Sequence, residues 1–474
     1  MATAVVLGGG VSGLAAAYYL QRQVSRFSKI ILLEASHRLG GWVSTTRFPD
    51  GAIYEHGPHS LRATGKPGQH TLTLLHELGL ESEILPVTQT HHGAQNRYIF
   101  YKNQLHCLPT SFSSIFKKSS LLSQSLVWSL IRDLVSKRAP TDDDETVHSF
   151  ISRRLGTEVA DVLMSSMCRG IFAGDVHKLS VRACFPDLYQ LEQNHRSLVL
   201  GSLFGGKSPA NTCPLVKKSR QEKWALYSLK QGLEQLTETL TQVLHQNPKC
   251  ELRLQSPCTG LQLDSGKATV QTENDCIKAD HVFSTIFAQY LSPLLSDSHK
   301  DLKQPLAQIS GANIIVVHLE FDGQVLPHQG FGHLVPHIEH TYFLGVIYDS
   351  SVFPSQDCQS STSTRLTVMM GGSWFDQLLD VCPEMSEESL TDLALKFVSE
   401  QLGISAPLRR SQVKLQKNCI PHYQLGHKDR LSQMQNYIAS YQLPLSLLGS
   451  SYKGPSVNDC ILNSRLVVDS FVSP

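Results

Sequence analysis

The chain has 474 residues, 41% of them hydrophobic, and a formal net charge of +1 at pH 7. This length allows about three domains, or two large interleaved ones, and the composition is that of a packed globular protein. The near-neutral charge gives no support for a nucleic-acid partner, which normally requires a basic excess. No run of about 18 apolar residues occurs, so no transmembrane helix is predicted.

The 11 cysteines are scattered singly, without a CxxC pair or a Cys/His spacing typical of metal ligands. This pattern predicts reduced, mostly buried thiols rather than a disulfide framework, and no metal site.

The first stretch of interest is the glycine turn Gly8-Gly9-Gly10-Val11-Ser12-Gly13. It follows the apolar run 4–7 and precedes an alanine-rich segment, 14–20, that is typical of a helix. A second apolar run, 29–33, ends at Glu34. The order of strand, glycine turn, helix, strand and acid predicts a dinucleotide site, with the pyrophosphate at the helix N-terminus and Glu34 on a ribose hydroxyl. The alternative is a purely structural turn.

A second glycine-rich stretch, Arg38-Leu39-Gly40-Gly41-Trp42, is followed by His56-Gly57-Pro58-His59-Ser60. Small residues here would let backbone amides approach a long FAD molecule, while an arginine offsets phosphate charge. We therefore favour FAD over NAD, the alternative being a pair of β-turns.

The middle of the chain is predicted to begin with a helix and connector over 67–90 and an alternating hairpin over 96–108. Residues 111–138 then form a basic amphipathic segment, in which Leu126, Leu130 and Leu134 share a face and Trp128 lies off it. Such a helix either lies in a membrane interface or packs on its own protein with a solvated basic face. Residues 146–200 are helical in pattern, and 205–220 are expected to be an exposed loop.

The last part returns to α/β patterning over 222–290, followed by strands over 302–416 that are interrupted by a helix at 388–402. A strand at 443–448 and a loop at 449–456 lead to a final helix, which begins near Val457 with Ser456 or Asn458 as its cap. The chain must return to its first domain, so this helix N-terminus is expected near the flavin ring.

Three internal stretches go beyond a generic flavoprotein: Glu145-Thr146-Val147-His148-Ser149-Phe150, Cys168-Arg169-Gly170-Ile171-Phe172-Ala173-Gly174-Asp175, and Gly330-Phe331-Gly332-His333-Leu334-Val335-Pro336. Together with the glycine motifs, the chain resembles the animal protoporphyrinogen oxidase family, within the amine-oxidase-like flavin superfamily, over its whole length. The resemblance implies non-covalent FAD, one per chain, and oxidation of protoporphyrinogen IX by oxygen, with release of hydrogen peroxide. This six-electron reaction is the penultimate step of haem biosynthesis.

The resemblance implies an α/β fold in three parts. A Rossmann-type FAD-binding domain (1–90, 222–290 and 432–474) is interleaved with a β-sheet substrate-binding domain (206–221 and 291–431) and a mainly helical membrane-docking domain (91–205). No catalytic acid–base pair is expected, because the flavin N5 carries the chemistry. The implied substrate contacts are Arg97, Gly170, Phe331, Leu334, Met369 and Ile420. The implied cofactor contacts are Gly8, Gly9, Gly10, Val11, Ser12, Gly13, Glu34, Ala35, Arg38, Gly40, Gly41, Trp42, Gly57, Pro58, His59, Ser60, Cys258, Ser450, Pro455, Ser456 and Val457.

The resemblance also implies a peripheral place on the mitochondrial inner membrane, facing the intermembrane space, a homodimer, and hand-over of product to ferrochelatase. Because the glycine turn starts within a few residues of Met1, no cleavable presequence is expected. Three departures stand out: His59 replaces a common arginine, Ser464 replaces a glycine of the last helix, and the loop at Pro455-Ser456 is less apolar than usual. Two rivals stay open, another superfamily oxidase acting on amines or carotenoids, and a non-catalytic carrier on the same fold.

Overall fold

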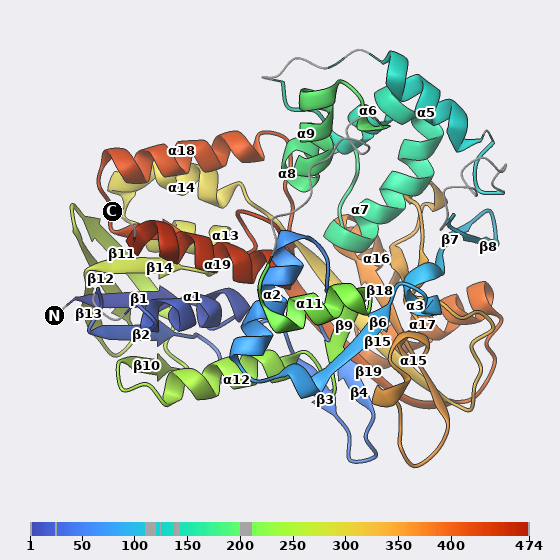
Figure 1. Ribbon diagram of the computed structural model, residues 1–474, viewed down its shortest axis with the longest axis horizontal. Helices are drawn as coiled ribbons and strands as arrows, with labels where there is room; N and C mark the ends of the chain where they lie inside the picture. The colour runs from blue at the N-terminus through green and yellow to red at the C-terminus, as the bar shows by residue number, and fades with distance from the viewer. Residues whose placement is uncertain are drawn as a thin grey trace.

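A computed structural model describes residues 2–23, 26–109, 120–123, 125–136, 138, 143–199 and 211–472. Its first layer is a five-stranded parallel sheet in the order β10-β2-β1-β14-β20 (Figure 1). The strands are β1 (Thr3–Leu7), β2 (Lys29–Leu33), β10 (Cys250–Arg253), β14 (His281–Ser284) and β20 (Leu445–Leu447). Three distant parts of the chain thus build one sheet, which confirms the predicted Rossmann-type architecture.

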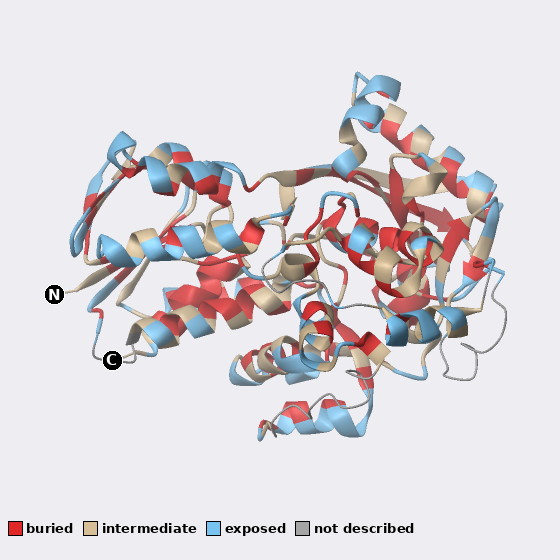
Figure 2. Ribbon diagram, turned by 90° about the horizontal axis from the view of Figure 1, so that it is seen from above, coloured by how far each residue is buried: buried red, intermediate tan, exposed pale blue. Residues whose placement is uncertain are grey.

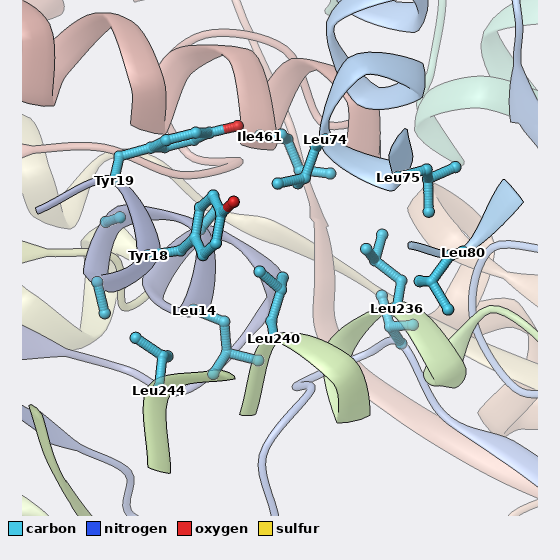
Figure 3. Packing of buried hydrophobic residues seen from close by; sticks show 14 of the residues in the cluster. Leu14, Tyr18, Tyr19, Leu74, Leu75, Leu80, Leu236, Leu240, Leu244 and Ile461 are labelled. Carbon is cyan, nitrogen blue, oxygen red and sulfur yellow. The ribbon is translucent and has the colours of Figure 1, made fainter. Parts of the chain in front are cut away.

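Both faces of this sheet are buried, and this explains why its strands are continuous apolar runs. Side chains alternate along a strand, so Ala4 and Val6 join one hydrophobic cluster, while Val5 and Leu7 join another. Four helices cover the first face: α1 (Val11–Gln21), α2 (Gly65–Glu77), α12 (Glu234–His245) and α19 (Val457–Val472). Figure 3 shows their side chains meeting, with Leu14, Tyr19, Leu240 and Ile461 among them.

The second face is covered by a small antiparallel sheet and by three helices. The sheet has the order β11 (Cys258–Asp264), β12 (Lys267–Thr272) and β13 (Cys276–Ala279). The helices are α13 (Ala288–Leu291), α14 (Lys300–Ala307) and α18 (His427–Ser440).

A seven-stranded sheet lies at the other end of the molecule, in the order β19-β15-β18-β17-β16-β7-β8 (Figure 1). The strands are β7 (Arg97–Tyr101), β8 (Gln104–Cys107), β15 (Gly311–Asp322), β16 (Gly332–Leu334), β17 (Phe343–Ile347), β18 (Ser363–Gly371) and β19 (Leu408–Pro421). Helix α17 (Glu387–Leu402) covers one face, where Phe397 stacks on Phe343 with ring centroids 3.7 Å apart. The opposite face carries Val316, Met369 and His318 toward the nucleotide-binding part.

Helices gather in a third body, with its own hydrophobic cluster, against the β7 and β16 end of this sheet (Figure 1). They are α5 (Leu126–Val135), α6 (Val147–Leu155), the π-helical turn η2 (Val159–Met164), α7 (Ser165–Phe172), α8 (Val181–Cys184) and α9 (Pro186–His195). The remaining elements are β3 (Thr45–Arg47), β4 (Ile53–Glu55), β5 (Leu61–Arg62), β6 (Ile84–Thr88), α3 (His92–Gln95), α11 (Pro214–Gln221), β9 (Trp224–Leu229), α15 (Asp349–Val352), α16 (Phe375–Val381), and 3-10 turns at 81–83, 292–294, 297–299, 337–339, 354–356 and 372–374.

Packing moves three of the predicted domain boundaries. The hairpin β7–β8 belongs to the seven-stranded sheet rather than to the helical part. Residues 214–221 form a helix whose Leu215 and Val216 pack into the cluster around α1, so this described part of 206–221 is neither a loop nor part of the substrate sheet. Likewise, Leu302 of α14 packs against the nucleotide-binding sheet. Local patterning predicts the type of an element, but the surface on which it packs depends on distant partners.

Helix α5 also differs from the predicted stripe. Its inward face carries Asp133, fully buried and ion-paired with the equally buried Arg154 (Oδ1 to Nε, 2.7 Å). Ser197 donates to the second carboxylate oxygen of Asp133 at 2.5 Å, and the Val199 N–H donates to the same oxygen at 3.1 Å, so the buried carboxylate is both ion-paired and hydrogen-bonded. Leu134 is half exposed, and Trp128 is 63% exposed. Figure 2 shows the same contrast across the molecule, with red inner faces and pale outer helix faces. Within the described residues, no helix is long and apolar enough to cross a membrane.

Candidate functional site

The glycine turn joins β1 to α1 by a backbone path that side chains would block. Gly8 has φ +98°, and a Cβ on Gly13 would lie 1.9 Å from the Gly8 carbonyl oxygen. The first turn of helix α1 thus packs on the Gly8 carbonyl. A hydrogen bond from the Leu14 N–H to the Gly10 carbonyl oxygen, at 3.0 Å, begins the helix. Glycine is therefore required at 8 and 13 by the fold itself.

Gly10 is different, because no neighbouring group in the described part of the chain requires it to be glycine. Its backbone is extended (φ −71°, ψ −179°), and an added Cβ would meet only the Gly41 Cα, at 3.8 Å. Helix α1 has no side-chain N-cap and no acidic residue in its first turn, so its end offers free N–H groups. This open position in front of an uncapped helix fits the close approach of an FAD pyrophosphate.

Glu34 stands at the carboxyl end of β2, beside the turn. Its carboxylate accepts hydrogen bonds from the Gly9 N–H at 2.7 Å and the Ser36 N–H at 2.8 Å. Those bonds fix its orientation and leave lone pairs for a ribose hydroxyl. A later segment of the chain passes beside Glu34, and its Ser256 N–H donates to the Glu34 carbonyl at 2.9 Å. Cys258 packs close by at the start of β11. Ala35 is exposed next to them.

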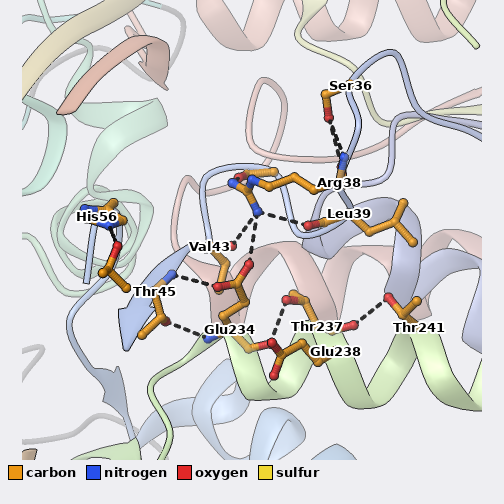
Figure 4. Close-up of polar contacts among 12 residues, drawn as sticks. Ser36, Arg38, Leu39, Val43, Thr45, His56, Glu234, Thr237, Glu238 and Thr241 are labelled. Atoms are coloured by element: carbon orange, nitrogen blue, oxygen red, sulfur yellow. Dashed lines mark hydrogen bonds and ion pairs between the residues drawn. The ribbon is translucent and has the colours of Figure 1, made fainter. Parts of the chain in front are cut away.

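The second glycine stretch lies directly against the first. The Gly40 N–H donates to the Gly9 oxygen at 2.9 Å, and Gly40 and Gly41 have φ of +103° and +60°. Arg38 holds this loop by donating to the carbonyls of Leu39, at 3.0 Å, and Gly41, and to Glu234 of α12 (Figure 4). In this structure, its guanidinium is thus committed to the loop rather than held out as a free phosphate ligand.

Beyond the loop, Gly57 passes under Trp42, since a Cβ on Gly57 would lie 2.0 Å from the Trp42 carbonyl oxygen. The Trp42 ring meets Phe287 edge-on at 6.4 Å. Pro58 and Ser60 are half-buried on either side of His59. The segment therefore runs from the glycine turn toward the seven-stranded sheet.

The C-terminal loop also reaches this region. Gly449 lies beside Ser12, the Ser450 carbonyl accepts from the Tyr423 hydroxyl, and Pro455 leads into α19. Ser456 caps α19 by accepting from the Asp459 N–H at 3.1 Å, which confirms one of the two predicted caps, and Val457 packs into the first cluster. Ser464 is fully buried, and its hydroxyl lies 2.9 Å from the Ser12 carbonyl oxygen and 2.8 Å from the Cys460 carbonyl oxygen. The contact with Ser12 joins α19 to α1.

Between the two sheets lies a buried set of titratable groups around His59. Its Nδ1 is 2.8 Å from Asp349 Oδ1, and its Nε2 is buried without a hydrogen-bond partner among the described residues. Burial by itself raises the pKa of Asp349, but the adjoining His59 and Arg365 and the Thr367 hydroxyl hold that pKa below its ordinary value. The free Nε2 suits a polar group of a bound cofactor or substrate.

His56 and His318 extend this set. His56 Nδ1 lies 3.2 Å from His318 Nε2, and the Thr46 hydroxyl lies 2.7 Å from His56 Nε2. Burial lowers the pKa of His56 to about 4 and that of His318 well below its ordinary value, so both imidazoles are neutral at pH 7. Burial also raises the pKa of Glu55 to about 7. The sequence pointed to the stretch that contains His56 and His59 but not to their partners, because His318 of β15 and Asp349 of α15 lie 262 and 290 residues further along the chain.

The predicted substrate residues come together on the face of the seven-stranded sheet that looks toward the glycine turn. One cross-strand row runs from Leu334 through Gly345 to Met369 and Val316. Ile420, paired with Ala312, belongs to the same apolar group as Met369. Gly170 of α7 touches the end of the row, because a Cβ there would lie 2.8 Å from Leu334 Cδ2.

Arg97 lies at the edge of this face, beside Gly332 in the neighbouring strand. Its side chain is exposed, and its guanidinium carbon is 5.6 Å from the centre of the Phe331 ring. Among the described residues, no carboxylate pairs with it. A fixed cation without an acidic partner, next to an aromatic ring and an apolar wall, suits a large apolar ligand that carries a carboxylate.

The parallel sheet, the uncapped helix behind a glycine turn and the acid after the second strand together define a dinucleotide-binding protein. The sequence matches the family described as flavin containing amine oxidoreductase over residues 11–468, so the chain belongs to that family. FAD is accordingly its cofactor, and the glycine-lined position at Gly10 fits it.

Similarity to individual proteins extends over nearly the full length. The chain is 45% identical over 472 residues to protoporphyrinogen oxidase of Bos taurus, covering 98% of this chain and 97% of the relative. It is 44% identical over 465 residues to protoporphyrinogen oxidase of Homo sapiens, with the same two coverages. The crystal structure of a protein from Exiguobacterium sp. 255-15 matches with a TM-score of 0.81 at 26% identity, over 99% of this chain and 98% of that one.

Two glycine variants separate a cofactor role from a folding role. We expect Gly10→Val to fold with a melting temperature near that of the apo wild type but to purify without flavin, because the side chain fills the open position. The measurement is flavin absorbance per chain beside circular dichroism. Gly13→Ala is the matched control, and we expect it to destabilise the fold itself. A yellow Gly10→Val protein would contradict the assignment.

Proposed function

We propose that this chain is an FAD-dependent oxidase of protoporphyrinogen IX, which uses oxygen as electron acceptor and releases hydrogen peroxide. One observation carries the proposal: Arg97, which has no carboxylate partner among the described residues, stands at the edge of an apolar sheet face that looks toward the dinucleotide site. The full-length similarity to animal protoporphyrinogen oxidases supports the same substrate.

Bound FAD supplies an N5 atom that accepts hydride, so that the protein needs no nucleophile or metal for the oxidation. The chain's own contribution is to bind and orient a flat, largely apolar macrocycle with carboxylate side arms. Leu334, Met369 and Ile420 offer an apolar wall from three strands of one rigid sheet. Phe331 adds an aromatic surface at the edge, and Arg97 holds a propionate, which fixes the ring's orientation.

Gly170 supports this arrangement from α7. Arg169, the residue before it, is buried and donates from Nη2 to the carbonyls of Thr341 and Phe343, both at 2.6 Å. Those bonds hold α7 against the sheet, so the Gly170 backbone can approach the substrate wall without a side chain intervening. His59, with its free Nε2, is the group we assign to the polar side of the site.

A direct assay tests the proposed reaction. The purified holoprotein should show the absorbance of bound flavin and convert protoporphyrinogen to protoporphyrin with three hydrogen peroxide molecules per porphyrin, as six electrons require. A flavin-containing protein that oxidises a primary amine or a carotenoid instead would favour the rival oxidases of the superfamily. A colourless protein would favour a carrier.

For Arg97→Ala, we expect kcat/KM for protoporphyrinogen to fall by an amount equivalent to about 1.5–3 kcal/mol, because a charge-assisted pair with a propionate is lost. Flavin content should be unchanged. Arg97→Lys keeps the charge without the two-pronged geometry and should be intermediate. The control is Arg220→Ala, an exposed arginine on α11, which should behave as wild type. Wild-type kinetics for Arg97→Ala would remove this residue from the site.

We also propose that α5 docks on the outer surface of the mitochondrial inner membrane, as a peripheral contact. Trp128, Ile131 and Val135 recur at helical spacing and are 63%, 44% and 78% exposed, with the exposed cation Arg132 between them. An apolar helix face with a tryptophan and flanking cations suits a membrane interface. The buried Asp133–Arg154 pair fixes which face of α5 turns outward. A homodimer and hand-over to ferrochelatase stay predictions.

The double variant Trp128→Ser/Val135→Ser should bind vesicles of anionic phospholipid about tenfold less, or weaker still, because two large apolar side chains no longer enter the interface. Co-sedimentation measures the bound fraction. Val381→Ser in α16 is the control, since Val381 is a comparably exposed apolar residue, at 56%, on another body. Equal binding by the wild type and the double variant would place the membrane contact elsewhere.

A further inference from the structure

Three histidines and one aspartate meet at the junction of the helical body with the seven-stranded sheet. His148 comes from α6, Asp161 from η2, His177 from the loop after α7, and His337 from the 3-10 turn that follows β16. One potential ligand atom of each of His148, Asp161 and His177 lies within 4.8 Å of the other two. The four residues come from four separate segments, so their spacing along the chain is not that of a known metal-binding motif.

The distances join the four side chains into one group. His148 Nε2 is 2.9 Å from Asp161 Oδ1, and His337 Nε2 is 3.9 Å from the same oxygen. The His148 and His177 rings lie 4.0 Å apart between centroids, and the His177 and His337 rings lie 5.2 Å apart. One carboxylate oxygen is therefore the centre around which the imidazoles gather.

The backbone holds these groups in place. The His148 N–H donates to the Val176 carbonyl at 3.0 Å, so His177 is fixed beside α6. The His337 N–H lies 3.3 Å from the Ser165 hydroxyl of α7. Asp161 sits in a π-helical turn, in which the inserted residue turns every following side chain by about 100° relative to a regular helix. Such insertions frequently occur at functional sites.

His337 faces the carboxylate of Asp161 with its Nε2. Its Nδ1 is buried and has no hydrogen-bond partner among the described residues. The other charged group nearest the cluster is Asp175, which already accepts from the His177 N–H at 2.9 Å. Three imidazoles thus lie around one carboxylate oxygen, which within the described part of the chain is hydrogen-bonded only to His148, and a cation among these groups would use the remaining ring nitrogens that face it.

We propose that His148, Asp161 and His177 bind a divalent transition-metal ion, Zn²⁺ in the first instance, with His337 in the fourth position. Imidazole nitrogens with one carboxylate suit Zn²⁺, which prefers four ligands in a tetrahedron. Metal–nitrogen distances of about 2.0–2.1 Å require the ligand atoms to lie about 3.3 Å apart. Side-chain rotations that move each ligand atom by about 1 Å would complete the site.

The site is structural in character, because four protein ligands leave no open position for a substrate. His337 follows Leu334 by three residues, and α7, which carries Gly170, begins directly after the π-helical turn that holds Asp161. A bound ion therefore clamps the helical body to the strand that forms the substrate wall. This role is separate from the flavin chemistry and does not depend on the substrate proposed above.

Metal binding to the full-length holoprotein, prepared without a histidine tag and freed of metal with a chelator, tests the proposal. Co²⁺ is the probe, and its visible bands at wavelengths beyond the flavin absorption report tetrahedral coordination. We expect one Co²⁺ per chain, displaced by one Zn²⁺, and a rise in melting temperature with Zn²⁺. His177→Ala should weaken binding by at least about tenfold and abolish the rise in melting temperature, since a direct ligand is lost.

His177 is exposed, so its replacement should leave the fold and the flavin content intact, as circular dichroism and absorbance would show. The matched control is His76→Ala, which removes a surface imidazole paired with Glu81 and should bind Co²⁺ as the wild type does. Absence of tetrahedral Co²⁺ bands in the wild type, or equal binding by the wild type and His177→Ala, would overturn the proposal. Wild-type binding by His337→Ala would exclude His337 from the ligand set.

Discussion

The structure depends on the close approach of two backbones at the end of β1. Gly13 lies so near Gly8 that a single methyl group would collide with a carbonyl oxygen, and the Gly9 carbonyl in turn accepts a hydrogen bond from Gly40. These contacts set the direction of α1 and the path of the loop over it. The same two segments form the position at Gly10 that fits the pyrophosphate. The contacts that fix the fold here therefore also shape the cofactor site.

The second sheet owes its role to its two different faces. Strand alternation sends Val317 and Val368 into the cluster under α17, and Val316 and Met369 toward the dinucleotide site. The first face stabilises the sheet, while the second is left to bind a ligand. Arg97 belongs to β7, where the sheet meets the helical body. The apolar wall and this cation are therefore both positioned by strands of one sheet.

Much of the site is visible in the sequence because it depends on local backbone requirements. The glycines at 8, 10 and 13, the acid at 34 and the strand-helix-strand order all lie within one short stretch, where spacing alone fixes geometry. The outcome at α5 is different. Its apolar periodicity predicts a stripe through Leu134, but Asp133 faces inward instead, because Arg154 is buried there and a buried guanidinium without a carboxylate partner would be costly. No pattern within α5 reveals the position of Arg154.

The sequence by itself determined the dinucleotide fold, the flavin class and the family, because glycine turns and apolar strand runs are properties of neighbouring residues. The tertiary structure alone decided that β7 and β8 complete the substrate sheet, that α11 and α14 serve the nucleotide-binding part, and that His59 meets Asp349. It also brought His148, Asp161, His177 and His337 together from four segments. Such contacts depend on how separate elements pack, and partners on separate elements leave no periodic signal in the chain, whether they are tens or hundreds of residues apart.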